Sequence, residues 1–385
     1  MQESESNGIN LSDDSRTKDI PIYGYPDIRQ VTGSPVHDVN ILLTSESPRS
    51  QKMVGDSKIL LPRTGEIKDD RCGELKNMGV CSSNPDHARI PIRHSCNRLE
   101  CPVCYGRPLL RAAEASAQRI QGYQSALGQA RLLDLTGSAI LPPRHFMISP
   151  PALIVNKCID RTWKTIEAHY WHPDDWGKVF ISKFRHEAYK ALQVADLEGG
   201  GFVAHLYRIR SELLGTITAA TKRFGLKDRW EYVLNRSDWR DLIYFSPHAH
   251  FPAYGTTVPT NQFYEVSGGW TIRMIREAST VQGLMYYLLS HAPVINGRLS
   301  ITYLGCLCPQ RLRCTEIRTE KEEMLCPECG AVMVIASCDD EGELLEIHME
   351  QPLVRRKKIR YYTLCTECGF KKTYKPLKRI RRTYA

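Results

Sequence analysis

Apolar and polar residues follow a helical period over three parts of the chain. The first part, PLLRAAEASAQRIQGYQSALGQARLL, is rich in Ala, Leu, Gln and Arg and predicts a helix that begins near Pro108. The second part, residues 154–224, is mainly helical in pattern, with breaks at HPDDW and at the glycines 199–201, which we interpret as a linker. The third part, residues 277–292 (EASTVQGLMYYLLSHA), predicts a helix that ends before Pro293.

Three other segments have the pattern of strands. RHFMISPP, residues 144–151, predicts a short strand that ends at a double proline. DLIYFSPHAHFPAYG, residues 241–255, predicts a second strand, and SGGWTIRMI predicts a third strand after a turn. Residues 303–385 add strand-like stretches and basic runs. Helices and strands together predict an α+β fold.

The length of 385 residues predicts two to three domains. Residues 1–70 are rich in Ser, Asp and Pro and have no sustained period, so we expect a disordered or loosely ordered segment. We expect a Cys-rich zinc-binding module with its helix over 71–135, a central catalytic domain over 136–300, and a zinc ribbon with a basic tail over 301–385.

Composition argues against a membrane or secreted protein. No window approaches about 18 consecutive apolar residues, as a membrane span requires. The N-terminal MQESESNGINLSDDS has neither the basic nor the apolar region of a secretory signal, so we expect a cytoplasmic location. In that compartment the 14 cysteines are expected to bind metal rather than to form disulfides.

The net charge of +9 is concentrated at the C-terminus. Residues 353–385 contain 12 Lys and Arg and one acid, so they carry +11 and residues 1–352 carry −2. Two runs, RRKKIRYY and KKTYKPLKRIRRTYA, interleave these cations with tyrosines. Cations neutralise phosphates and aromatic rings stack on exposed bases, so we expect this region to bind nucleic acid.

His248 and His250 are two residues apart in an apolar strand. Because strand side chains alternate between faces, both imidazoles point to the same side, roughly 7 Å apart at Cα. Two imidazoles so placed can converge on one divalent ion and leave open positions for water or substrate. The alternative is a pair of buried histidines that form only hydrogen bonds.

The predicted helix over 277–292 carries Tyr286, Tyr287 and His291. Tyr287 and His291 share one helix face, and Tyr286 points about 100° away. A tyrosine hydroxyl becomes an effective nucleophile when a metal ion polarises the phosphate that it attacks. Core packing alone would also explain paired tyrosines, so the functional interpretation depends on the histidine strand and the tyrosine helix occurring together.

These segments resemble a known family. PHAHFPAYG is similar to the His-hydrophobic-His motif of HUH endonucleases, YYLLSHA resembles their tyrosine helix, and RHFMISPP resembles their first strand-borne motif. The order of these segments, with HSCNRLECPVC upstream, is similar to rolling-circle replication initiator (Rep) proteins of archaeal plasmids and viruses. The resemblance covers roughly residues 72–295.

The resemblance implies an antiparallel sheet flanked by helices that presents the histidines to Mg²⁺ or Mn²⁺. It further implies that the tyrosine attacks single-stranded origin DNA, remains linked to the 5′-phosphate and frees a 3′-OH primer, with host replication proteins as further partners. Many relatives have a lysine three residues after the tyrosine, where this chain has Ser290 if Tyr287 is the nucleophile. A third metal ligand is also implied. The candidates are His291, which we favour, Asp241 and Glu231.

Two CxxCG motifs lie in the C-terminal region. Cys326 and Cys329 form the first, and Cys365 and Cys368 form the second. Two such motifs on neighbouring hairpins give a tetrahedral zinc ribbon, so we expect these four thiolates to hold one Zn²⁺. We assign no role to the remaining C-terminal cysteines, which are Cys306, Cys308, Cys314 and Cys338.

A second structural zinc site is predicted in the N-terminal Cys-rich block. Cys96, Cys101 and Cys104 have the spacing of metal ligands. The candidates for the fourth ligand are Cys81, which we favour, Cys72 and His94. The leading hypothesis for the chain is thus a Rep-type nickase, and the alternatives are an HUH transposase or relaxase, or a non-catalytic zinc-ribbon regulator that binds DNA.

Overall fold

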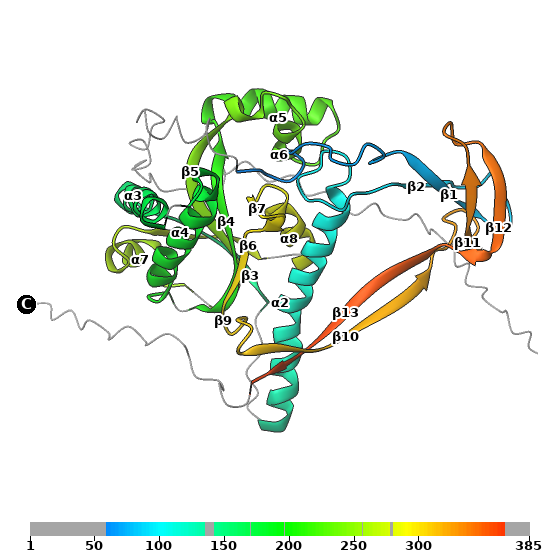
Figure 1. The fold of residues 1–385 in the computed structure, drawn as a ribbon. Helices are drawn as coiled ribbons and strands as arrows, with labels where there is room; N and C mark the ends of the chain where they lie inside the picture. The colour runs from blue at the N-terminus through cyan, green and yellow to red at the C-terminus, as the bar shows by residue number, and fades with distance from the viewer. Residues whose placement is uncertain are drawn as a thin grey trace, which may run out of the picture.

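The computed structural model describes residues 59–134, 142–169, 171–195, 197–255, 257–277 and 280–365. At its centre lies a five-stranded antiparallel sheet with the strand order β6-β3-β5-β4-β9 (Figure 1). Its strands are β3 (Arg144–Ser149), β4 (Leu197–Ile209), β5 (Ile243–Gly255), β6 (Thr271–Glu277) and β9 (Ile301–Gly305). The predicted α+β class is confirmed, as are the three strands predicted from the sequence.

Helices cover both faces of this sheet. Phe146 of β3 and Phe251 of β5 belong to the same buried cluster as Phe180 and Phe184 of α4. The helices of this cluster are α3 (Ala152–His169) and α4 (Trp176–Leu192). Val203 of β4 instead packs with α2 (Gly106–Asp134) and α8 (Val281–Leu289). Because Phe251 faces α4, strand alternation directs the neighbouring His250 to the opposite face.

The segment from 197 to 209, expected as helix with a glycine linker, is strand β4. Its glycines lie inside the sheet because a side chain would not fit there. A Cβ on Gly200 would lie 2.7 Å from the Cβ of Ala253, and one on Gly199 would lie 2.5 Å from the carbonyl oxygen of Leu304. The glycines therefore permit close approach of neighbouring strands, and the expectation of a linker was wrong.

Small elements complete the central part of the chain. They are η3 (Pro173–Asp175), η4 (Ser211–Leu213), α5 (Leu214–Arg223), α6 (Arg229–Leu234), η5 (Trp239–Leu242), α7 (Thr260–Val266), β7 (Val294–Ile295) and β8 (Arg298–Leu299). In the described part of the chain, no helix combines the length and apolar composition needed to cross a membrane.

A separate four-stranded sheet, with the order β12-β11-β1-β2, lies at one end of the molecule (Figure 1). It combines β1 (Leu75–Cys81) and β2 (Ile90–Arg93) with β11 (Met333–Cys338) and β12 (Leu344–Pro352). We call this sheet and its loops the distal head. β10 (Leu312–Glu323) and β13 (Val354–Leu364) pair as a long two-stranded antiparallel ribbon, with β11 and β12 inserted between them in sequence. This ribbon, which we call the β10–β13 hairpin, runs from α2 to the distal head (Figure 1).

The distal head changes the expected domain organisation. We expected residues 71–135 and 301–385 to form two independent metal-binding units, but β1 pairs with β11 along four residues. The expected boundary at residue 70 was also too late, because Ile59 and Leu61 are buried in the main core and Leu60 bridges to Val294. Residues 1–58, and residues 366–385 with most of the basic tail, lie outside the described residues.

Candidate metal centres and catalytic site

His205, His248 and His250 form a group that could hold a metal ion. His205 lies on β4 and the other two on β5, and one ligand atom from each lies within 4.8 Å of the others. The register shifts at this point, because one residue of β4, Leu206, lies opposite two residues of β5, Ser246 and Pro247. This β-bulge at Ser246 and Pro247 changes the direction of the next side chain, that of His248.

Hydrogen bonds determine which nitrogen of two of these histidines faces an ion. His205 donates its Nε2–H to the carbonyl oxygen of Leu288 at 2.9 Å, so its Nδ1 keeps a free lone pair. His248 donates its Nδ1–H to the carbonyl oxygen of Ser246 at 2.8 Å, so its Nε2 is free. Outer hydrogen bonds of this kind orient the histidine ligands of metal sites.

His250 is oriented by another histidine. Its Nδ1 lies 2.8 Å from Nε2 of His145 on β3, which leaves Nε2 of His250 for an ion. Burial lowers the pKa of His248 and of His250 well below the ordinary value, and lowers the pKa of His205 to about 3. All three imidazoles are therefore neutral at neutral pH, as metal binding requires.

His291, which we expected as the third ligand, lies beside the group rather than in it. Its ring centroid is 4.2 Å from that of His205, and it stacks on Trp230 at 4.7 Å. Helix α8 ends at Leu289, so His291 follows the helix and is not part of it. His205 occupies the third position, which sequence analysis assigned to His291 with Asp241 and Glu231 as alternatives.

Tyr287 lies next to this group. Its ring centroid is 5.0 Å from that of His291, so the expected contact between these two residues is present even though the helix is shorter than predicted. Tyr286 points elsewhere, and burial, together with the nearby Tyr105, raises its pKa. Both tyrosines are half-buried. The structure thus brings Tyr287 to the histidines and separates Tyr286 from them.

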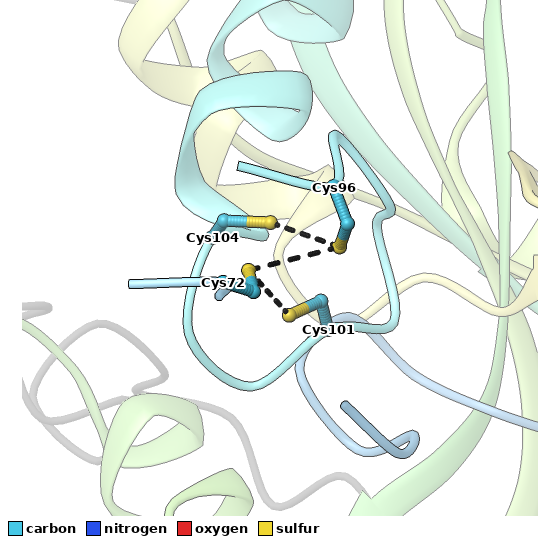
Figure 2. A group of neighbouring side chains, drawn as sticks. All are labelled: Cys72, Cys96, Cys101 and Cys104. Atoms are coloured by element: carbon cyan, nitrogen blue, oxygen red, sulfur yellow. Dashed lines mark hydrogen bonds between the residues drawn. The ribbon is translucent and has the colours of Figure 1, made fainter. Parts of the chain in front are cut away.

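Four cysteine sulfurs form a second group at the start of α2 (Figure 2). The Sγ–Sγ distances are 3.8 Å for Cys72–Cys96, 3.6 Å for Cys72–Cys101 and 3.3 Å for Cys96–Cys104. Tetrahedral zinc with Zn–S bonds of about 2.3 Å requires separations of about 3.8 Å. Cys72, and not Cys81 as expected, is the fourth cysteine.

Protonation of the thiols also fits a metal at this group. Burial raises the pKa of Cys104, but hydrogen bonds from Ser95 and from the other cysteines outweigh burial and bring it to about 6. At neutral pH Cys104 is therefore a thiolate, the form that binds a metal ion. With four sulfurs the group leaves no open position, so it could hold a structural ion such as zinc.

Cys81 belongs to a third group, with His87, Cys326 and Cys329, in the distal head. The sulfurs of Cys81 and Cys329 are 3.4 Å apart, and Nδ1 of His87 lies 3.3 Å from Cys329 Sγ. A hydrogen bond from the Ser83 hydroxyl is the largest influence on the pKa of Cys81 and lowers it to about 6. Three sulfurs and one imidazole are a common zinc ligand set.

The structure does not bring the two CxxCG motifs together, as the expected zinc ribbon requires. Cys365 donates its amide to the carbonyl of Arg311 at one end of the β10–β13 hairpin, whereas Cys326 follows the other end. Twelve residues of β10 separate these ends by about 35 Å at the usual strand rise. Cys368 lies outside the described residues.

Two candidate ligands, His205 and His87, were not expected from the sequence. His205 was hidden because the glycines before it were interpreted as a linker inside a helical region; the apolar run GGGFVAHLYRI is the signal that could have indicated a strand. His87 lies in a loop six residues after Cys81, a spacing that becomes informative only once Cys81 is known to be a ligand.

The β10–β13 hairpin separates its charges by face. Directly opposed residues share a face, and one face has the opposite-charge pairs Glu322–Arg355 and Glu320–Lys357. The other face has Lys321 opposite Arg356, followed by Lys358 and Arg360. Part of the basic run RRKKIRYY is therefore neutralised within the hairpin. The remaining cations of the run, together with Lys321, form a cationic face, which we define as Lys321, Arg356, Lys358 and Arg360.

Comparison with known proteins provides no independent assignment for this site. No protein-family model, no curated protein and no solved structure matches the chain.

Proposed function

We propose that this protein is a metal-dependent DNA nickase and strand transferase of the HUH endonuclease type that initiates rolling-circle replication. One observation carries the proposal. His205 of the three-histidine group donates a hydrogen bond to the carbonyl of Leu288, the residue next to Tyr287. This bond and the ring of His291, between Tyr287 and His205, tie a hydroxyl nucleophile to a candidate ion site.

In the proposed reaction, the Oη of Tyr287 attacks a phosphorus atom of single-stranded DNA. A bond forms between Oη and phosphorus while the bond from phosphorus to the 3′ oxygen breaks. The phenolic proton passes to water, the 3′ oxygen takes up a proton, and the 5′-phosphate remains on the tyrosine. The new 3′-OH then serves as a primer.

A bound divalent ion would stabilise the charge that develops on the phosphate oxygens. The three histidines fit such an ion, because they are neutral and their remaining hydrogen bonds leave one lone pair each for it. Imidazole favours transition-metal ions over Mg²⁺, so of the two ions expected from the sequence, Mn²⁺ fits this ligand set better.

The cationic face of the hairpin supports DNA as the partner. Within the described strands β10 and β13, this face has four cations, from Lys321 to Arg360, and one acidic residue, Glu323. Cations arrayed at strand spacing can contact successive phosphates and release counterions. A metal ion in the distal head would hold one end of this region in place, and Gln118 of α2 bonds to Lys358 and Arg360 toward its other end.

The test uses the full chain, Mn²⁺ and a labelled pool of single-stranded oligonucleotides that includes hairpin-forming sequences. We expect cleavage and a covalent protein–DNA band that persists in denaturing gels. Tyr287→Phe should abolish the band, and Tyr286→Phe, which removes the neighbouring hydroxyl, should retain it. Mass spectrometry of the DNA-linked peptide identifies the tyrosine directly.

Three outcomes separate the hypotheses. Absence of any covalent band with the wild-type chain contradicts the nickase and leaves the DNA-binding regulator. A band that survives Tyr287→Phe transfers the nucleophile to Tyr286. If the enzyme cleaves but supports no run-off DNA synthesis from the cleaved origin, a transposase or relaxase replaces the replication initiator.

A further inference from the structure

Arg208 of β4 is an arginine inside the protein without an acidic partner. It is half-buried, its Nε is fully enclosed and has no hydrogen-bond partner, and its Nη2 donates to Ser149 Oγ at 3.0 Å. Within the described residues no carboxylate pairs with it. Burial lowers the pKa of Arg208, which means that the protein does not compensate the charge fully.

Two other enclosed arginines have partners that offset their charge. Arg98 lies 2.6 Å from the carboxylate of Glu100. Arg119 donates to the carbonyl oxygens of Leu307 and Leu312 at 2.8 and 2.7 Å. A desolvated cation without such partners is unfavourable, and an anion bound from outside would relieve that cost.

The position of Arg208 indicates where such an anion would lie. Its hydrogen-bond partner Ser149 lies two residues along β3 from Met147, which pairs directly with His250 of β5, so Ser149 and His250 lie on the same face of the sheet. Met147 also pairs directly with Arg273 of β6, an exposed cation, which places Arg273 on that face as well. Two cations and the hydroxyl of Ser149 therefore gather on one flank of the candidate ion site.

We infer that Arg208, with Ser149 and Arg273, forms a phosphate-binding subsite that takes a phosphodiester group of single-stranded DNA beside the three-histidine group. The planar fork of arginine matches the oxygens of a phosphate and binds it through two parallel hydrogen bonds. This inference rests on the proposed function for its ligand. It also supplies a fixed positive charge in a chain that has Ser290 where related enzymes have lysine.

The first test measures binding of a single-stranded oligonucleotide by fluorescence anisotropy in EDTA, which removes any contribution of the divalent ion. Arg208→Met should weaken binding about tenfold and reduce the salt slope of log K by about 0.7, the value for one lost phosphate contact on a single strand. Arg210→Met is the matched control, because Arg210 directly follows β4 but pairs with Glu212, and it should change binding less than twofold.

The second test needs no DNA. Inorganic phosphate, compared with chloride at equal ionic strength, should raise the melting temperature of the wild-type chain and of Arg210→Met. It should not raise that of Arg208→Met, whose melting temperature without phosphate should equal or exceed that of the wild type. Arg208→Lys, which retains the charge but loses the fork, should give an intermediate phosphate effect.

The results distinguish this inference from the proposed function. If Arg208→Met binds the oligonucleotide as the wild type does, or if phosphate stabilises both equally or neither, the subsite does not exist, whether or not the tyrosine adduct forms. Binding that depends on Arg208 in a chain that never forms the adduct supports the subsite and contradicts the nickase.

Discussion

At the scale of single residues, hydrogen bonds rather than proximity decide which groups can bind an ion. Five histidines lie close together on one side of the sheet, but His145 and His291 differ from the other three. His145 shares a hydrogen bond with His250, whereas His291 stacks on Trp230 and contacts Tyr287 edge to face. We therefore assign His145 an orienting role and His291 a packing role beside Tyr287.

This assignment predicts different effects of two glutamine substitutions on metal binding. His205→Gln should weaken Mn²⁺ binding by more than tenfold, because a ligand nitrogen is lost. His291→Gln should weaken it by less than threefold, because the ring contacts His205 without contributing a ligand. Isothermal titration calorimetry at pH 7 measures both. Equal losses in the two variants would return His291 to the ligand set.

At the scale of secondary-structure elements, a buried carboxylate joins α3 and α4, the two helices that pack on the face of the central sheet opposite the histidines. Glu187 of α4 is buried and accepts hydrogen bonds from Arg161 of α3 at 2.8 Å and from Lys157 of α3 and Lys190 of α4 at 3.5 Å. Burial raises the pKa of Glu187, but Lys157 and Lys190 outweigh burial and the net pKa is lowered. The ionised form is thus favoured in the folded chain.

Glu187→Gln should therefore lower the free energy of unfolding by about 2 kcal/mol at pH 7. Because the folded pKa lies below the unfolded one, the contribution is complete above the unfolded value of about 4.3 and is lost as pH falls through the folded pKa. Urea unfolding should show a clear difference between the wild type and the variant at pH 7 and a smaller one at pH 3. Glu212→Gln, in an exposed pair, should change little at either pH.

At the scale of the whole molecule, an N-terminal and a C-terminal segment of the described chain pair in the distal head. Cys81 and Cys329 are 248 positions apart, yet their sulfurs lie 3.4 Å from each other. The β10–β13 hairpin connects this head to α2, where Gln118 bonds to Lys358 and Arg360. A metal ion in the head would therefore fix the position of the cationic face relative to the central sheet.

The metal content of cysteine variants tests whether Cys81 and Cys326 bind the same ion. Cys81→Ser and Cys326→Ser should each remove the same zinc ion, so the double variant should lose no more zinc than either alone, as measured by elemental analysis of the purified chain. Cys104→Ser should remove a different ion, so its loss should add to that of Cys81→Ser. Cys365→Ser should retain the ion that Cys326 binds. Loss of that ion in Cys365→Ser would restore the zinc ribbon.

The sequence alone determined the features that depend on local geometry. Strand alternation placed His248 and His250 on one face, and spacing grouped Cys96, Cys101 and Cys104, because such patterns report how neighbouring residues are oriented. The order of strands and helices gave the α+β class for the same reason.

Only the tertiary structure decided which distant segments complete each site. His205 joins β5 through the order and register of the sheet, Cys72 displaces Cys81, and Cys81 and His87 meet Cys326 and Cys329 through the pairing of β1 with β11. Strand order, bulges and register are set by packing over the whole chain, and a periodicity of two or 3.6 residues contains no information about them.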